Sequence, residues 1–127
     1  MVNVILITYG IMALGALADA ETIVGKGSRI QVVTLLRNEG LEDLKSKVRI
    51  EFENGIGEDN LVMTDIKGGI PWNACVMLAG SYSFTLVAGL NVPMLIEAIF
   101  QMDEAVASAE LAEKVCAAGH SSIRVLK

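Results

Sequence analysis

The chain has 127 residues, a length that suits one domain with its own core and is too short for two. Fifteen acidic residues against ten basic ones give a net charge of −5 at pH 7, which argues against a nucleic-acid partner because phosphate contacts need clustered basic side chains. Hydrophobic residues make up 53% of the chain, more than in a typical lone soluble domain. The surplus needs a membrane span, a sheet covered on both faces or a subunit interface.

The apolar amino-terminal stretch fits neither a signal peptide nor a membrane span. No Lys or Arg precedes it, Tyr9-Gly10 interrupts it, and no run approaches the about 18 apolar residues that a spanning helix needs. Cys75 and Cys116 lack the spacing of a metal or redox motif, so we expect two reduced thiols packed as small apolar side chains. We therefore expect a cytoplasmic protein with no metal and no cofactor.

Apolar segments of strand length alternate with helical patterns along the chain. The first strand is expected at residues 2–8, and the next ones at residues 29–36, 60–64 and 84–88. A short strand of alternating polarity is expected at residues 122–126. The first strand is apolar on both faces, which is typical of a parallel sheet covered by helices on each side.

Helices are expected between these strands and after the fourth one. They are placed at residues 11–24, 41–53, about 71–80, from 93 onward, and about 105–118. Pro71 and Pro93 suit the first turns of their helices, where the missing N–H costs nothing. Gly25 and Gly27 suit the end of the first helix, and Gly119 suits the end of the last one.

This alternation predicts an α/β protein with a three-layer α/β/α sandwich and a mostly parallel sheet. Right-handed crossovers and the common arrangement of open sheets of this size predict the strand order 2-1-3-4. The polar-alternating strand at residues 122–126 is expected at an edge of the sheet, either antiparallel or paired with another subunit.

The predicted strand order creates a crevice between the carboxyl ends of the first and third strands, where the sheet reverses direction. Thr8, Tyr9 and Gly10 follow the first strand, and residues 65–73 (DIKGGIPWN) follow the third. Ligands of open α/β sheets bind at such a point, so these two loops form the candidate site.

The second of these loops allows two interpretations. Gly68 and Gly69 permit close backbone approach, and the helix after them would begin with free N–H groups that attract an anion such as phosphate. Asp65 could act as a base or orient a donor, and Thr8 and Asn73 could supply hydrogen bonds. In the alternative interpretation the loop is a tight strand-to-helix turn, and Asp65 bonds its backbone.

Three motifs in register are shared with one known family. Thr8-Tyr9-Gly10 stands where that family has Thr/Ser-His-Gly. Residues 65–73 resemble its Asp-x-x-Gly-Gly-Thr/Ser-Pro-x-Asn, and residues 88–95 (AGLNVPML) resemble its Gly-Val-Asn-Leu/Ile-Pro-Met-Leu. The family is the enzyme IIA component of the mannose-type family of the bacterial phosphoenolpyruvate-dependent sugar phosphotransferase system. The resemblance covers the whole chain and implies a single enzyme IIA domain over residues 1–127, the sheet order given above, and a homodimer in which the last strand crosses to the partner subunit.

The resemblance also implies a function and two departures from it. In the family, the histidine after the first strand takes a phosphoryl group from the carrier protein HPr and passes it to enzyme IIB, so HPr-like and IIB-like partners are implied, with a membrane reached only through the sugar permease. Here that position is Tyr9, whose phenol has a pKa of about 10 and forms a stable ester. Imidazole instead forms a labile phosphoramidate. Ile70 stands where the family has a hydroxyl group.

Carried over residue by residue, the resemblance assigns the catalytic position to Tyr9 and Asp65. It assigns phosphate or partner binding to Thr8, Gly10, Lys67, Gly68, Gly69, Ile70, Pro71 and Asn73. His120 is the only histidine of the chain, and we expect it at the surface, far from the crevice.

Three functional hypotheses follow from these observations. The first is an enzyme IIA-like component that binds its partners but is impaired in phosphoryl transfer. The second is an active carrier that uses Tyr9 or an unforeseen residue. The third is a sensor or regulatory module on the same fold that binds an anion or a small ligand, with Tyr9 closing the pocket. The sequence leaves open whether the chain is an enzyme, and it does not indicate the sugar.

Overall fold

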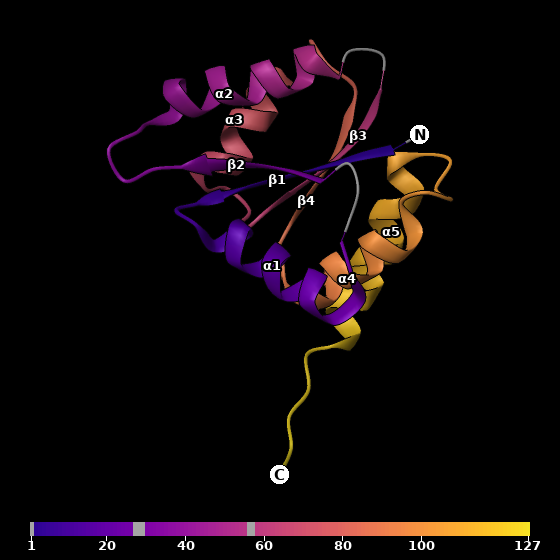
Figure 1. Ribbon diagram of the computed structural model, residues 1–127. Coiled ribbons are helices and arrows are strands. Elements are labelled where there is room, and N and C mark those ends of the chain that lie inside the picture. Colours follow the sequence, from indigo (N-terminus) through magenta and orange to yellow (C-terminus); the bar gives the residue numbers. More distant parts are fainter. Residues whose placement is uncertain (1, 27–29, 56–57) are drawn as a thin grey trace.

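The computed structural model describes residues 2–26, 30–55 and 58–127, and in these residues a sheet of four parallel strands lies between two layers of helices (Figure 1). The strands are β1 (Val2–Tyr9), β2 (Ile30–Leu35), β3 (Asp59–Thr64) and β4 (Phe84–Ala88), in the order β2-β1-β3-β4. The helices are α1 (Met12–Val24), α2 (Leu41–Asn54), α3 (Ile70–Leu78), α4 (Val92–Gln101) and α5 (Ser108–Ser121). The predicted α/β class and strand order are confirmed. Gly27 and the expected strand start at residue 29 lie outside the described residues.

β1 lies inside the sheet and buries side chains on both faces. Val4 and Leu6 belong to a cluster packed by α1, α4 and α5, whereas Ile5 and Ile7 belong to a second cluster packed by α2 and α3. The alternation follows from the period of two residues along a strand. Much of the apolar surplus of the sequence therefore lies in a sheet that is covered on both faces.

The predicted end of the last helix is wrong. α5 runs from Ser108 to Ser121, so Gly119 lies inside the helix and is buried. A Cβ atom built at Gly119 would lie 2.7 Å from Cγ of Met94 in α4. The glycine therefore marks a close approach of α5 to α4 and not a helix end. Gly25, in contrast, does end α1, with φ of 92° in the left-handed region that favours glycine.

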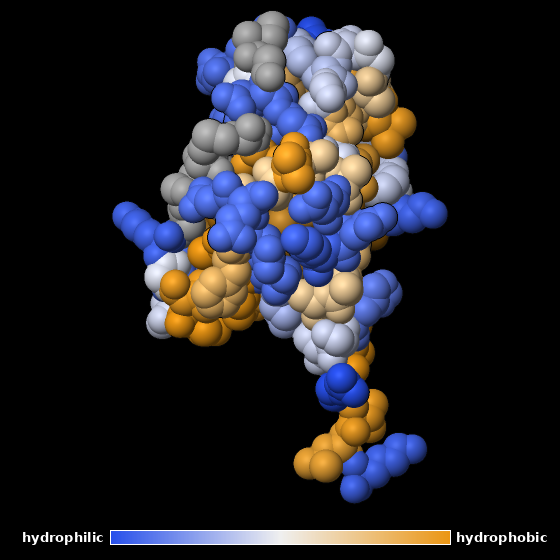
Figure 2. All heavy atoms as spheres, turned by 90° about the vertical axis from the view of Figure 1, so that its right-hand side faces the viewer, coloured by the Kyte–Doolittle hydropathy of each residue, from blue (hydrophilic) through white to orange (hydrophobic). Residues whose placement is uncertain are grey.

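The edge strand predicted at residues 122–126 is not formed in this chain. Residues 123–127 have no regular structure and project away from the body of the protein (Figures 1 and 2). Ile123, Val125 and Leu126 are 74%, 80% and 99% exposed. An extended segment becomes a strand only when its N–H and C=O groups face those of a neighbour, and this tail has no such neighbour among the described residues.

Candidate functional site

The carboxyl ends of β1 and β3 meet beside the start of α3. Ile7 pairs with Thr64 in the sheet, so Tyr9 and Asp65 follow at the same edge. Asp65 accepts the N–H of Tyr9 on Oδ2 at 2.8 Å and the N–H of Ile66 on Oδ1 at 2.9 Å. Both carboxylate oxygens therefore bind backbone, and Asp65 holds the two strand ends together.

The side chain of Tyr9 reaches from the end of β1 to the first turn of α3. Its hydroxyl oxygen accepts the N–H of Ile70 at 2.9 Å. Its ring lies against Gly69, where a Cβ atom would lie 3.1 Å from Cε2 and 3.3 Å from the hydroxyl oxygen of Tyr9. The sequence predicted that this helix begins with free N–H groups, and for Ile70 that prediction is wrong because Tyr9 takes the N–H. No local sequence signal reveals a contact across 61 residues.

The loop after β3 is a tight strand-to-helix turn. Gly68 has φ of 84°, which suits glycine, and its carbonyl oxygen accepts a hydrogen bond from Nδ2 of Asn73 at 3.1 Å. The N–H of Gly69 donates to the carbonyl of Ile66 at 3.1 Å, and the N–H of Asn73 donates to the carbonyl of Gly69 at 2.9 Å. Together with the bonds of Asp65, these contacts match the structural interpretation of this loop.

Thr8 and Gly10 support the loop after β1. Thr8 is fully buried, and its hydroxyl oxygen accepts the N–H of Ala13 in the first turn of α1 at 3.1 Å. Its side chain therefore faces α1, whereas that of Tyr9 faces α3. Gly10 has φ of 52° and donates its N–H to the carbonyl of Leu35 at the end of β2 at 2.8 Å. These two residues build the scaffold of the site.

Lys67 and Pro71 take different places in the same loop. Pro71 is buried in the first turn of α3, as predicted, and Lys67 is exposed. Lys67 and Asp65 line a hollow of about 620 Å³ that extends along β4 to Cys116. The positive charge of Lys67 at this hollow is compatible with the binding of an anion there.

His120 lies in the last turn of α5 and is exposed, as expected. It lines a hollow of about 190 Å³ together with Gly89 and Asn91, which follow β4. It is therefore at the same edge of the sheet as the crevice and closer to it than the sequence suggested. β3 still separates β4 from β1, so His120 is not a neighbour of Tyr9 in the sheet.

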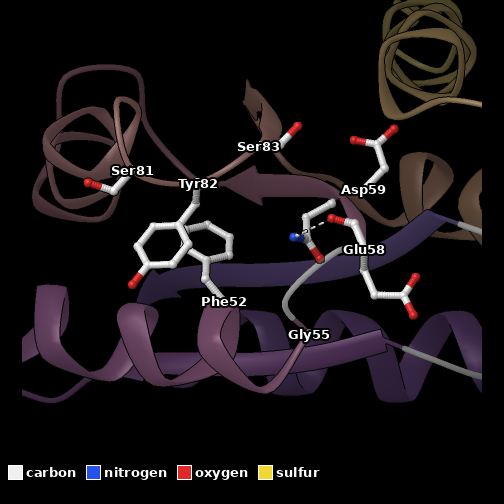
Figure 3. A pocket seen from close by; sticks show the side chains of 8 residues that line it. Phe52, Gly55, Glu58, Asp59, Ser81, Tyr82 and Ser83 are labelled. Carbon is white, nitrogen blue, oxygen red and sulfur yellow. Dashed lines mark hydrogen bonds between the residues drawn. The ribbon is translucent and has the colours of Figure 1, made fainter.

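A further hollow, of about 280 Å³, lies at the opposite, amino-terminal edge of the sheet (Figure 3). The rings of Phe52 and Tyr82 lie side by side at one end of it, with their centroids 5.1 Å apart. At the other end, the carboxylate of Asp59 accepts hydrogen bonds from the N–H and the hydroxyl group of Ser108. Those contacts hold the start of α5 against β3, and the sequence did not predict them.

The structure also bears on cysteines, metals and membranes. Burial raises the pKa of the Cys75 thiol to about 12, whereas Cys116 is half-buried. Within residues 2–26, 30–55 and 58–127, no three His, Cys, Asp or Glu side chains gather as metal ligands. None of the helices described there has the length and hydropathy to cross a bilayer.

Comparisons with known proteins agree on one family. The family model described as "PTS system fructose IIA component" matches residues 3–116. The mannose-specific EIIAB component of Escherichia coli K12 is 24% identical over 99% of this chain, which spans 40% of that protein's length. The sorbose-specific EIIA component of Lacticaseibacillus casei is 29% identical over 75% of this chain and 70% of its own. A solved mannose/sorbose-specific IIA subunit from Enterococcus faecalis is 31% identical, with a TM-score of 0.91 over 98% of this chain and 94% of that one.

Proposed function

Because this chain belongs to the mannose-type enzyme IIA family of the phosphotransferase system, we propose that it is an enzyme IIA-like component impaired in phosphoryl transfer. In this proposal residues 1–127 form one IIA domain, and Tyr9 stands where the family has its phosphoryl-accepting histidine. The observation that carries the proposal is the place of Tyr9. It ends β1 beside Asp65, with its hydroxyl oxygen 2.9 Å from the backbone nitrogen of Ile70.

The chemistry of this arrangement disfavours phosphoryl transfer. A phenol with a pKa of about 10 is neutral at pH 7 and a poor nucleophile, and its phosphate ester is too stable to pass the group on. The hydrogen bonds of Asp65 among the described residues go to backbone N–H groups, and its carboxylate is not hydrogen-bonded to the Tyr9 hydroxyl group as a base would be. Ile70 offers no hydroxyl group to a phosphoryl oxygen. The same internal hydrogen bonds favour a closed site over the small-ligand sensor that the sequence also allowed.

The proposed activity is the binding of HPr-like and enzyme IIB-like components in the cytoplasm, with the sugar permease reached only through them. Exposed apolar side chains at the carboxyl edge support it. The residues that follow β1, β2 and β3 there include Ile11, Met12, Leu36 and Ile66. The hydrogen bonds Gly10–Leu35 and Tyr9–Asp65 bring these strand ends together, so the exposed apolar residues lie at the same edge of the sheet as Tyr9. Exposed apolar side chains gathered at one edge of a protein are typical of sites that bind another protein.

Phosphoryl transfer is tested by incubating the protein with phosphoenolpyruvate, enzyme I and HPr and then measuring its intact mass. We expect no gain of a phosphoryl group by the wild type. A gain of mass would contradict the proposal, and the acid stability of the added phosphoryl group would show which residue carries it. An acid-labile group absent from His120→Asn lies on the only histidine, whereas an acid-stable group absent from Tyr9→Phe lies on Tyr9.

A gain-of-function variant tests the position assigned to Tyr9. The double substitution Tyr9→His with Ile70→Thr restores an imidazole and a hydroxyl group on an unchanged backbone. We expect it to accept an acid-labile phosphoryl group from HPr. Tyr82→His, a histidine placed at the amino end of β4, is the matched control and should accept none. A double variant that folds but stays unmodified would remove the assignment.

We also propose that the chain forms a homodimer in which residues 122–126 of each subunit pair with β4 of the other. Among the described strands β4 pairs only with β3, which leaves an open edge. The hollow beside Lys67 runs along that edge, and the exposed tail carries Ile123, Val125 and Leu126. Light scattering of the full chain should give the dimer mass, and a chain that ends at Ser121 should give the monomer mass. Equal masses would contradict strand exchange.

A further inference from the structure

The first turn of α3 already has an occupant from the chain itself. Tyr9 places its hydroxyl oxygen 2.9 Å from the nitrogen of Ile70, at the start of a helix, where N–H groups lack partners within the helix. Pro71 has no N–H, and the N–H of Asn73 bonds the carbonyl of Gly69. An incoming anion could therefore use two N–H groups among residues 70–73, those of Ile70 and Trp72. Tyr9 takes the N–H of Ile70.

The side chain of Tyr9 lies closely against the backbone of the turn before α3. The ring of Tyr9 fits against Gly69 so closely that a methyl group there would lie 3.1 Å from Cε2, tighter than ordinary van der Waals contact. At the other end of the residue, Asp65 fixes the Tyr9 backbone N–H at 2.8 Å. Both ends of Tyr9 are thus held, although the residue is 39% exposed.

We propose that Tyr9 is a built-in plug: its hydroxyl group and ring occupy the start of α3 and exclude phosphate and phosphoryl groups from it. The site opens only when the Tyr9 side chain rotates away from Gly69 and Ile70. This inference rests on the proposed function for the identity of the site, and it deepens that function by assigning the closed state to an internal contact. Tyr9 then has two separate effects: its side chain excludes the anion from the site, and its phenol is a poor nucleophile.

Titration of inorganic phosphate into isotope-labelled protein, followed by NMR, tests the plug without any partner protein. Tyr9→Ala removes ring and hydroxyl group, and Tyr82→Phe is the matched control that removes a hydroxyl group at the other edge. We expect the amides of Gly69, Ile70 and Trp72 to shift in Tyr9→Ala, with an affinity at least about tenfold above that of the wild type and of Tyr82→Phe. Equal affinity in wild type and Tyr9→Ala, or no local shifts in Tyr9→Ala, would overturn the proposal.

A second variant covers the case in which Tyr9→Ala does not fold. Tyr9→Phe keeps the ring and its contact with Gly69 and removes only the oxygen. Hydrogen exchange of the Ile70 amide should become faster than in the wild type, and that of Asn73 should stay the same. Unchanged exchange at Ile70 would overturn the plug. Neither measurement involves HPr, so phosphorylation of the wild type would refute the proposed function and leave these results to be judged separately.

Discussion

Two helix glycines differ in what an added methyl group would meet, and replacing each by alanine tests how α5 packs on α4. At Gly119 in α5, a Cβ atom would lie 2.7 Å from Cγ and 3.0 Å from Sδ of Met94, which is buried. At Gly15 in α1, no described atom lies within 4 Å of that position. Gly15→Ala therefore gains only helix propensity, about 0.5–1 kcal/mol. Gly119→Ala gains the same amount but loses about 1–3 kcal/mol to overpacking.

Urea denaturation followed by circular dichroism measures both effects. We expect Gly15→Ala to raise the free energy of unfolding and Gly119→Ala to lower it by about 1 kcal/mol, or roughly 4 °C in Tm. In a Met94→Ala background the loss from Gly119→Ala should shrink, because the side chain that the methyl group meets is gone. If Gly119→Ala stabilised the wild-type background as much as Gly15→Ala does, the close approach of the two helices would be refuted.

Two further predictions concern titratable groups. Because burial raises the pKa of Cys75 to about 12, iodoacetamide should label native protein at Cys116 first and label both thiols only in urea; equal native labelling by peptide mapping would contradict this. The hydrogen bond from Lys47 lowers the pKa of Glu39, so its contribution to stability is present above the ordinary carboxyl pKa and is lost as the pH falls through the lowered value. Glu39→Gln should therefore destabilise the protein at neutral pH, and this effect should shrink as the pH falls below the ordinary carboxyl pKa, whereas Glu42→Gln should have little effect across the same range.

The fold was predictable because its signals are local. The run that forms β1 is apolar on both faces, and this pattern predicted a parallel sheet covered by helices on each side. Pro71 and Pro93 indicated helix starts, which the structure confirms. Gly119 misled because a glycine after a periodic segment favours a helix end only when nothing packs on it. Gly119 instead allows α5 to approach Met94, 25 positions earlier in the chain, and no local pattern encodes that contact.

The sequence predicted which loops lie together at the candidate site, but it did not predict the hydrogen bonds between their residues. The strand order placed the loops of Tyr9 and Asp65 together, and the hydrogen bond between them agrees with that prediction. What Thr8, Asp65 and Asn73 do there was left open, since each can serve a ligand or the backbone. In the structure all three serve the backbone. The choice depends on which N–H and C=O groups the turn leaves nearby, and only three-dimensional geometry decides it.

The frame of the site does not depend on the two side chains that set its chemistry. Asp65 binds the N–H of residue 9, and the turn after β3 is closed through backbone groups of Gly68 and Gly69. Those bonds use the N–H of residue 9 and groups of the turn, and none of them uses the side chain of Tyr9 or Ile70, so we expect them to persist when these two residues are exchanged for others. The structure therefore separates a backbone scaffold, which the family relationship explains, from the side chains of Tyr9 and Ile70. Phosphoryl acceptance by Tyr9→His with Ile70→Thr follows from that separation, whereas a scaffold that needed the Tyr9 hydroxyl group for its shape would lose it in the same variant.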